Sequence, residues 1–276
     1  MVPLSWTEAN RRLERAAAVL NTDGPAPPLP PGPCHLGIDL GTADIVVMAL
    51  DAHGEPQACF LEWTEVVRDG VVVDFAGAVE VTRRLVERAA SRLGVSFRAA
   101  STSYPPGTDP RLSTYVLDRL GLEVAGLADE PSCVARLLEL DRTAVVDVGG
   151  GTTGTAVVQA GKVVFSGDLP TGGRHITLVL AGHYGISVAD AETRKRSGDP
   201  AEILRLARPT LERMCEIVAG HIRGHDVHEL LLTGGTCCLA GVDGVFAEVL
   251  GLPVRLPVQP LLLTPLAIAS LGLAGG

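Results

Sequence analysis

Residues 145–154 read VVDVGGGTTG, and this stretch decides the fold. Apolar residues lead to a single carboxylate, Asp147, before the glycines, and apolar residues resume at Ala156. Glycine permits a tight hairpin whose consecutive backbone N–H groups form a concavity suited to an anion. We therefore expect a strand, a phosphate-binding loop and a returning strand. The loop residues are Gly149, Gly150, Gly151, Thr152 and Thr153.

The same plan occurs a second time near the beginning of the chain. Residues 36–42 read LGIDLGT, in which Asp39 precedes Gly41 and Thr42, and an apolar strand follows at 45–48. Two hairpins of one design predict two related halves that face each other across a single site.

Composition restricts the class of protein. The chain has 276 residues, 46% of them hydrophobic, and a mean hydropathy of +0.28, which fits a compact α/β protein of one large or two medium domains. A net charge of −9 and only 4% aromatic residues argue against a nucleic-acid-binding surface, because nucleic acids attract clustered cations and stack on aromatic rings. Six cysteines without C-x-x-C spacing, and no secretory signal before them, predict a reducing cytoplasm.

Both ends of the chain carry helix signals. Ser5 and Glu8 form an S-x-x-E capping pattern before an amphipathic stretch, and a proline-rich spacer follows at 25–33. The predicted helix is either a detachable docking element for a partner or an element that packs on the body. The apolar run 261–276 is too short for a membrane span. We expect it to form a buried helix with Thr264 as its N-cap.

The rest of the sequence contains no Walker A motif, no nucleophile elbow and no H-E-x-x-H helix. It holds Glu130, just before a predicted helix, and a third glycine turn, Gly234-Gly235-Thr236, after an apolar strand. With the hairpins these residues could hold a nucleoside triphosphate, because amides and hydroxyls bind phosphates while Asp39 and Asp147 bind Mg²⁺ through its water shell. Hydrolysis then requires a group that orients water, for which Glu130 is the candidate.

Each of these residues also has a purely structural interpretation. The glycine hairpin could be only flexible, and Glu130 could be a helix-start carboxylate stabilised by the helix dipole. Glu192 and Lys195 lie three apart on a charged helix, where a solvated ion pair contributes little. The three histidines of the segment 221–228 have metal-like spacing, but a glycine between them is expected to end the helix.

In their order along the chain, the motifs resemble those of the actin/DnaK/MreB ATPase superfamily. One such motif is weak evidence, whereas five in the same order are specific. They are residues 37–42, 128–131 and 147–152, the pair Glu192 and Lys195, and residues 233–236. Over nearly the whole chain the sequence is also similar to the EutJ family of ethanolamine-utilisation proteins. That similarity rests on residues 67–70, 102–111, 149–154 and 264–269.

The resemblance implies a duplicated ribonuclease-H-like α/β fold, the actin-like ATPase fold, with two lobes around a nucleotide cleft. It implies an N-terminal helix and linker in 1–33, a first lobe in 34–142 to which a C-terminal helix at 265–276 returns, and a second lobe in 143–264. The segment between Lys195 and Thr233 is short, which implies a reduced subdomain in the second lobe.

The resemblance also implies a role toward ATP and Mg²⁺ for each matched residue. The phosphate loops would be formed by Gly41 and Thr42 in the first half and by Gly149 to Thr153 in the second. The ribose would lie near Glu192 and Lys195, and the adenosine near Gly234, Gly235 and Thr236. The metal would lie beside Asp39 and Asp147, and the attacking water beside Glu130.

Two departures from the superfamily pattern bear on catalysis. Gly154 stands where DnaK-like and MreB-like chains carry an acidic residue, so one acidic contact near the metal is missing. No lysine of the first half matches the catalytic lysine of the chaperones, and Arg68 is the candidate substitute. No peptide-binding domain is expected after Gly276, so a chaperone of this kind would not hold clients as DnaK does.

The family implies a setting in the ethanolamine-utilisation bacterial microcompartment of the cytoplasm, where its members are regarded as chaperone-like. We expect a slow Mg²⁺-dependent ATPase with a chaperone-like or assembly role there, and shell proteins or ethanolamine-pathway enzymes as partners. Three alternatives remain open. They are a non-hydrolysing nucleotide-binding scaffold, a reactivating factor for an adenosylcobalamin-dependent lyase, and an MreB-like filament former.

Overall fold

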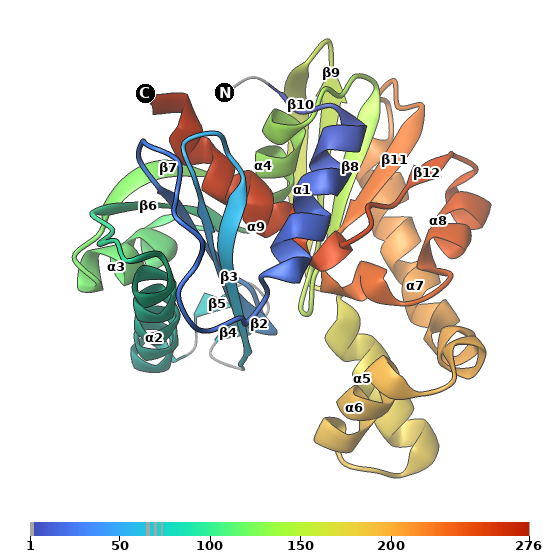
Figure 1. Ribbon diagram of the computed structural model, residues 1–276. Coiled ribbons are helices and arrows are strands. Elements are labelled where there is room, and N and C mark those ends of the chain that lie inside the picture. The colour runs from blue at the N-terminus through green and yellow to red at the C-terminus, as the bar shows by residue number, and fades with distance from the viewer. Residues whose placement is uncertain (1–2, 65–66, 69–70, 73, 276) are drawn as a thin grey trace.

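The computed structural model describes residues 3–64, 67–68, 71–72 and 74–275. Two five-stranded sheets stand side by side, with helices between them and on their outer faces (Figure 1). No helix in these described ranges is long and apolar enough to cross a membrane.

The first sheet has the strand order β3-β2-β1-β6-β7. Its first three strands form an antiparallel meander, and β6 and β7 continue the sheet in parallel from β1. The parallel part brings the carboxyl ends of β1, β6 and β7 to one edge. The strands are β1 (His35–Leu40), β2 (Asp44–Leu50), β3 (Pro56–Trp63), β6 (Ala99–Tyr104) and β7 (Glu123–Asp129). A two-stranded ribbon of β4 (Val67–Arg68) and β5 (Val71–Val72) is separate from this sheet.

The second sheet repeats this arrangement in the order β10-β9-β8-β11-β12. Again three antiparallel strands are followed by two parallel ones, with β8 in the place of β1. The predicted duplication is therefore confirmed, and both Asp-bearing hairpins stand at equivalent places. The strands are β8 (Thr143–Val148), β9 (Thr153–Gln159), β10 (Lys162–Leu169), β11 (Glu229–Thr233) and β12 (Val254–Arg255).

Alternate residues of each central strand face different helices. Val46 on β2 joins the core between the two sheets, whereas its neighbour Ile45 packs toward α2 and α3. In the second sheet Val145 faces the same central core and Val146 faces α7 and α8. Strands covered on both faces read as continuous apolar runs, as these do. The helices are α1 (Trp6–Ala18), α2 (Phe75–Leu93), α3 (Arg111–Arg119), α4 (Glu130–Leu137), α5 (Gly173–Tyr184), α6 (Val188–Ser197), α7 (Pro200–Ile222), α8 (Val242–Leu250) and α9 (Pro260–Leu271), with short 3₁₀ turns η1 (Gly235–Cys238) and η2 (Gly272–Gly275).

A small helical unit made by α5, α6 and the beginning of α7 projects below the second sheet (Figure 1). It belongs to the second half of the chain, where the resemblance implies a reduced subdomain. Ser187 and Asp199 cap α6 and α7 by accepting hydrogen bonds from backbone amides three residues on. These caps satisfy amides that a helix leaves unpaired at its start.

The C-terminal helix starts earlier than predicted. α9 begins at Pro260, so Thr264 and Pro265 lie inside it, and the assignment of Thr264 as N-cap was wrong. Proline fits the first turn of a helix, where its missing N–H loses no hydrogen bond. The Thr264 hydroxyl instead donates to Oδ2 of Asp147 at 2.7 Å. The role of Thr264 is therefore this tertiary hydrogen bond and not helix capping.

The N-terminal helix α1 packs on the body of the protein. The Ser5 side chain accepts from the Glu8 amide, as the capping pattern predicts. The Glu8 side chain, however, binds Arg11 and Arg12. Leu13, on the apolar face, is fully buried in the core between the sheets. Of the two interpretations of this helix, local packing is the one the structure shows.

Candidate functional site

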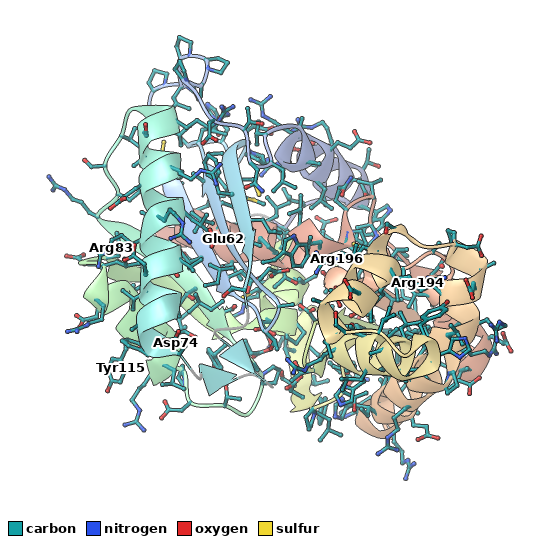
Figure 2. The ribbon with its side chains drawn as sticks, turned by 90° about the horizontal axis from the view of Figure 1, so that it is seen from below. Glu62, Asp74, Arg83, Tyr115, Arg194 and Arg196 are labelled. Atoms are coloured by element: carbon teal, nitrogen blue, oxygen red, sulfur yellow. The ribbon has the colours of Figure 1, made fainter. Side chains whose placement is uncertain are left out.

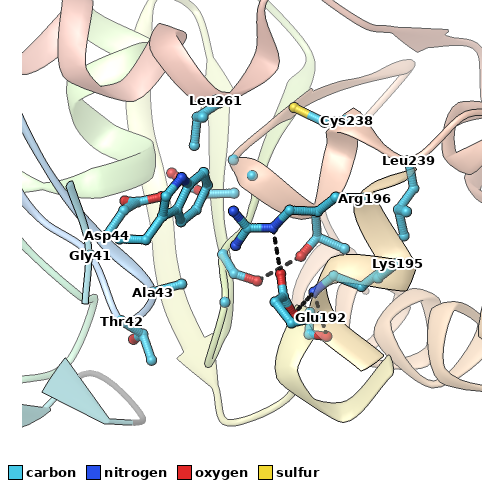
Figure 3. Close-up of a pocket in the computed structure, with 18 of the residues that line it drawn as sticks. Gly41, Thr42, Ala43, Asp44, Glu192, Lys195, Arg196, Cys238, Leu239 and Leu261 are labelled. Atoms are coloured by element: carbon cyan, nitrogen blue, oxygen red, sulfur yellow. Dashed lines mark hydrogen bonds and ion pairs between the residues drawn. The ribbon is translucent and has the colours of Figure 1, made fainter. Parts of the chain in front are cut away.

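The two glycine hairpins meet at the carboxyl ends of β1 and β8. The backbone of Gly150 lies so close to Ala43 that a Cβ at position 150 would be 2.7 Å from the Ala43 Cβ. Beside this contact lies a cavity of about 370 Å³, within the range of about 300–1,000 Å³ typical of ligand pockets. Figure 3 shows Gly41 to Asp44 on one wall and Glu192, Lys195 and Arg196 on the opposite wall.

Most of the residues singled out from the sequence line this one cavity. They are Asp39, Gly41, Thr42, Glu130, Asp147, Gly149, Gly150, Thr152, Glu192, Lys195, Gly234, Gly235 and Thr236. Two predicted residues do not line it. Thr153 donates its hydroxyl to the Thr171 carbonyl at 2.6 Å, and Gly151 lies under Gly172, where a Cβ would be 2.6 Å from the Gly151 carbonyl carbon. Both hold the second loop in shape.

The second loop is fixed by hydrogen bonds from two other segments. The amide of Gly173, at the start of α5, donates to the Gly149 carbonyl at 2.9 Å, and the amide of Arg174 donates to the Gly150 carbonyl at 2.8 Å. From the other side the Thr236 hydroxyl donates to the Gly149 carbonyl at 2.8 Å. The loop carbonyls are thus directed outward to protein partners, which leaves its cavity side for a ligand.

The two strand-end aspartates face the same cavity. Ser103 donates to Oδ1 of Asp39 at 3.4 Å, and Thr264 donates to Oδ2 of Asp147 at 2.7 Å. Burial raises the pKa of Asp39 well above its usual range, and the charges of Asp44 and Asp147 raise it further. Burial also raises the pKa of Asp147 to about 6, although the Thr264 hydroxyl opposes this. Each carboxylate is thus short of positive charge.

Glu130 is the first residue of α4, one position further into the helix than the sequence predicted. Asp129 caps α4 by accepting from the Ser132 amide at 3.1 Å, which leaves the Glu130 side chain to line the cavity. Burial raises the pKa of Glu130 well above its usual range, and the charges of Asp147 and Asp39 add to the effect. A raised pKa in a cavity marks a functional candidate rather than an ordinary helix-start carboxylate.

The third glycine turn closes one end of the cavity. Gly234 has a φ of +92°, and a Cβ there would lie 2.4 Å from Oδ1 of Asp147. Only glycine fits such a position. The turn continues as η1, where Gly235 and Thr236 line the cavity. The close approach to Asp147 therefore accounts for a glycine at position 234, whether or not the turn contacts a ligand.

Glu192 and Lys195 form an ion pair at 2.7 Å. Lys195 Nζ also donates to the Gly173 carbonyl and the Thr177 hydroxyl, so the pair ties α6 to α5. Although burial raises the pKa of Glu192, hydrogen bonds from Lys195 and Thr177 lower it overall. Burial lowers the pKa of Lys195, against the hydrogen bond with Glu192. This is not the solvated surface pair of the structural interpretation.

Asp44, Trp63 and Arg196 also line the cavity and were not predicted as site residues from the sequence. Asp44 opens β2 and is only 8% exposed. Arg196 donates to Glu192 at 2.8 Å and places its Cζ 3.5 Å from the centre of the Trp63 ring. The signal for Asp44 was a carboxylate at the head of an apolar run, which is costly to bury unpaired. The pairing of Arg196 with Trp63 has no sequence signal, because the two lie in different halves.

Asp44 adds a further acid to the first loop. Burial raises its pKa to about 7, although Arg196 opposes the shift and Asp147 adds to it. Figure 3 shows the Asp44 side chain on the wall opposite Arg196. The contact between Arg196 and Trp63 spans the same opening, because α6 belongs to the helical unit and β3 to the first sheet.

Two other sequence features lie apart from the cavity. The His221 and His225 rings pack against Phe165, at 5.3 and 5.6 Å between ring centres. Among the described residues no group of three or more histidine, cysteine or acidic side chains could hold a metal ion directly. The Arg68 side chain lies outside the described residues, so the structure does not test it as a substitute for the chaperone lysine.

Comparisons with known proteins agree on the fold. A family model for the cell division protein FtsA matches residues 144–269. The crystal structure of MreB5 of Spiroplasma citri bound to AMPPNP superposes with a TM-score of 0.65 at 16% identity, covering 86% of this chain and 95% of that one. At that identity the likeness shows the actin-like ATPase fold alone.

Two comparisons extend to the family. The ethanolamine utilization protein EutJ of Salmonella typhimurium is 48% identical over 264 residues, which is 95% of this chain and 93% of that protein. The crystal structure of EutJ from Carboxydothermus hydrogenoformans matches with a TM-score of 0.90 at 41% identity, covering 97% of this chain and all of that one. The chain belongs to the EutJ family of ethanolamine utilisation proteins.

Proposed function

We propose that this protein binds ATP with Mg²⁺ in the cavity between its two sheets and hydrolyses it slowly. The observation that carries the proposal is the convergence of both glycine hairpins, both strand-end aspartates and the third glycine turn on one cavity. Any one of these features has a structural explanation. Their meeting at the carboxyl ends of β1, β8 and β11 favours a shared ligand.

The residues present fit Mg²⁺ and a nucleotide. Asp39 and Asp147 repel each other in a buried site, and a cation between them relieves that repulsion. Mg²⁺ keeps several waters and takes few protein ligands, which agrees with the lack of a three-ligand cluster among the described residues. Ile203, Leu204 and Leu239 add apolar surface to the lining, which suits a purine base.

The proposed roles follow from these positions. Gly41 and Thr42 of the first loop, with Gly149, Gly150 and Thr152 of the second, would bind the phosphates. Mg²⁺, when bound, would supply positive charge to those phosphates. Glu130 orients the attacking water, because hydrolysis of a phosphoanhydride needs positioning and charge stabilisation more than covalent chemistry. Glu192 and Lys195 lie near the ribose. MreB5, which shares this fold, is bound to AMPPNP in its crystal structure, and this supports nucleotide binding by a protein of this fold.

We further propose that residues 34–142, with the C-terminal segment 265–276, and residues 143–264 act as two lobes that close on ATP. A ligand shifts such an equilibrium only by its different affinity for the open and closed forms. The closed form would present a surface to shell proteins or enzymes of the ethanolamine microcompartment, in a chaperone-like or assembly role. The family membership supports this setting.

Calorimetry with ATP and Mg²⁺, followed by a phosphate-release assay, tests the proposal. We expect binding with slow turnover by the intact protein. Glu130→Gln keeps the shape of the side chain but removes its charge, so turnover should fall at least about 100-fold while ATP still binds. Asp147→Asn should weaken binding that depends on Mg²⁺.

The matched control is Glu139→Gln, which removes an exposed carboxylate just beyond the same helix. It should leave both binding and turnover unchanged. If Glu130→Gln hydrolysed ATP as fast as the unsubstituted protein, Glu130 would have no role in hydrolysis. Binding without any turnover by the intact protein would instead identify a nucleotide-binding scaffold.

A further inference from the structure

Three neighbouring strands place two acids and a glycine in one row. Asp147 on β8 pairs with Gly154 on β9, and Gly154 pairs in turn with Asp168 on β10. Directly paired residues of antiparallel strands point to the same face of a sheet. The two carboxylates therefore point to one face, and the residue between them has no side chain to fill the gap.

Asp168 directs an oxygen into that gap. A Cβ built on Gly154 would lie 3.4 Å from Oδ1 of Asp168 and 3.7 Å from the Pro131 ring. The Thr152 side chain hydrogen-bonds the Asp168 carboxylate and opposes the rise of its pKa, but the buried Oδ1 atom has no hydrogen-bond partner among the described residues. Leaving a buried carboxylate oxygen unpaired is costly. The space above Gly154 is thus a small cradle with an unsatisfied acceptor on its wall.

The cradle lies beside two other acids, because Gly154 pairs with Asp147 and the Pro131 ring follows Glu130 in α4. The charge of Asp168 acts on Glu130, and the charge of Asp147 acts on Asp168. The cations that line the cavity, Lys195 and Arg196, are both bound to Glu192 on the far wall. The acids around Gly154 therefore have a shortage of positive charge that a bound cation and its waters would relieve.

We propose that Asp168 positions water of the Mg²⁺ hydration shell between Asp147 and Glu130, and so supplies from β10 the carboxylate that position 154 lacks. This inference rests on the proposed binding of Mg²⁺ and ATP. Asp168 is a positioning residue, since it would act through water. Replacing a residue that orients metal-bound groups in this way typically lowers metal affinity by roughly 10- to 100-fold.

The test compares ATP binding in EDTA with binding over a Mg²⁺ series, measured by calorimetry, for the intact protein and Asp168→Asn. In EDTA, we expect Asp168→Asn to bind ATP with the same affinity as the unsubstituted protein. It should need about tenfold more Mg²⁺ to reach full affinity. Asp226→Asn, which removes an exposed carboxylate of the surface pair with His228, controls for net charge and should change neither quantity.

A second variant separates positioning from a role in folding. Gly154→Asp combined with Asp168→Asn moves the carboxylate to the neighbouring strand, and the room above Gly154 admits a Cβ at ordinary contact distances. The double variant should recover most of the Mg²⁺ dependence. Thermal unfolding in EDTA shows whether each variant is folded, and Mn²⁺ as a probe ion reports changes in its bound waters by electron paramagnetic resonance.

The outcomes distinguish this inference from the function on which it rests. If the intact protein binds no ATP, both fall. If it binds ATP with Mg²⁺ and folded Asp168→Asn shows the same Mg²⁺ dependence, only the role of Asp168 is overturned. The role of Asp168 is also overturned if Asp168→Asn changes the Mg²⁺ dependence and the double variant with Gly154→Asp does not restore it. A purely structural aspartate would behave in that way.

Discussion

The two glycine hairpins share a sequence pattern, but different interactions hold them in place. The second loop is bonded to α5 and to η1 through the carbonyls of Gly149 and Gly150. The first loop rests on its own sheet, where the Thr64 amide donates to the Ala43 carbonyl at 3.0 Å. Its strand β1 is pressed against α9 at Gly37. A duplicated motif thus yields one loop shaped by hydrogen bonds and one placed by packing.

The difference assigns different parts to the two halves. A loop held by several backbone hydrogen bonds is preformed, so a phosphate would bind to it without further ordering of the loop. The first loop carries instead a buried acid, Asp44, and a neighbour, Trp63, that contacts the opposite wall. We infer that ATP binds to the second loop as it stands and draws the first loop to it.

The largest expected effect concerns the packing that places β1. A Cβ on Gly37 would lie 2.5 Å from the Cα and backbone N of Ala269 on α9. Helix and strand would have to separate, so Gly37→Ala should lower the free energy of unfolding by about 3 kcal/mol, as overpacking does. Urea unfolding measures the change.

A second alanine serves as the control for this substitution. Gly182 lies in α5 with no atom within 4 Å of a built Cβ. Gly182→Ala should therefore gain up to about 1 kcal/mol, because alanine favours a helix. Equal stability of the two variants would mean that α9 does not fix the position of β1.

The next effect concerns the acid of the first loop. Burial raises the pKa of Asp44 to about 7, so its contribution to stability is complete at low pH and is lost as pH rises through that value. Between pH 6 and pH 8 the ligand-free protein should lose about 1.5 kcal/mol from this group, at up to about 1.36 kcal/mol per unit. Urea unfolding across that range should show a flatter pH profile for Asp44→Asn.

The pH range stays above the isoelectric point near 5.3, so precipitation does not interfere. Asp51→Asn is an unsuitable comparison, because Asp51 accepts from the amides of His53 and Glu55. Asp190→Asn, in the first turn of α6, is the better control and should keep the slope of the original. Parallel profiles for the original and Asp44→Asn would show that Asp44 is solvated in solution.

The hairpins were predictable because they are local. Asp39 and Asp147 end apolar strands, and the glycines that follow allow few conformations other than tight turns. The repetition of that pattern predicted two related halves, and the family resemblance implied the actin-like fold. The start of α9 was not predictable in the same way, because Thr264 meets the local rule for an N-cap while its hydroxyl bonds Asp147 across the molecule.

Two of the residues that were not predicted depend on long-range contacts. Arg196 resembles any arginine of a charged helix, and only the fold brings it to Trp63. Asp168 was not recognised, because its importance arises from its register opposite Gly154. The sequence identified the glycines and strand-end acids of the loops and the pair Glu192 and Lys195. It did not identify Asp44 of the first loop, nor the residues whose partners lie on another strand or in the other half.

A smaller effect tests the hydrogen bonds of the second loop. Thr236→Val removes the hydroxyl that donates to Gly149 but keeps the shape of the side chain. We expect a loss of about 1 kcal/mol in stability and a several-fold weaker affinity for ATP, measured by urea unfolding and calorimetry. Thr193→Val removes a hydroxyl that bonds the Ala189 carbonyl within exposed α6, and it should leave ATP affinity unchanged. A preformed loop is excluded if both variants bind ATP like the original.

The smallest effect concerns the contact that spans the opening of the cavity. Arg196 stacks on Trp63 of β3, whereas Arg194 of the same helix stacks on Tyr184 inside the helical unit. Figure 2 shows Arg196 on the side of that unit nearer the first sheet and Arg194 further within it. Only the first contact joins the two halves, and an exposed contact of this kind contributes about 0.5–1 kcal/mol.

Arg196→Gln should therefore release ATP about two- to fivefold faster, while Arg194→Gln should release it at the original rate. The chain has two tryptophans, so in a Trp6→Phe background the fluorescence of Trp63 reports the contact directly. We expect Arg196→Gln to change that fluorescence in the free protein and Arg194→Gln to leave it unchanged. Identical release rates for the two variants would show that the first loop stays in place without the contact, and that the two loops differ less than their bonds imply.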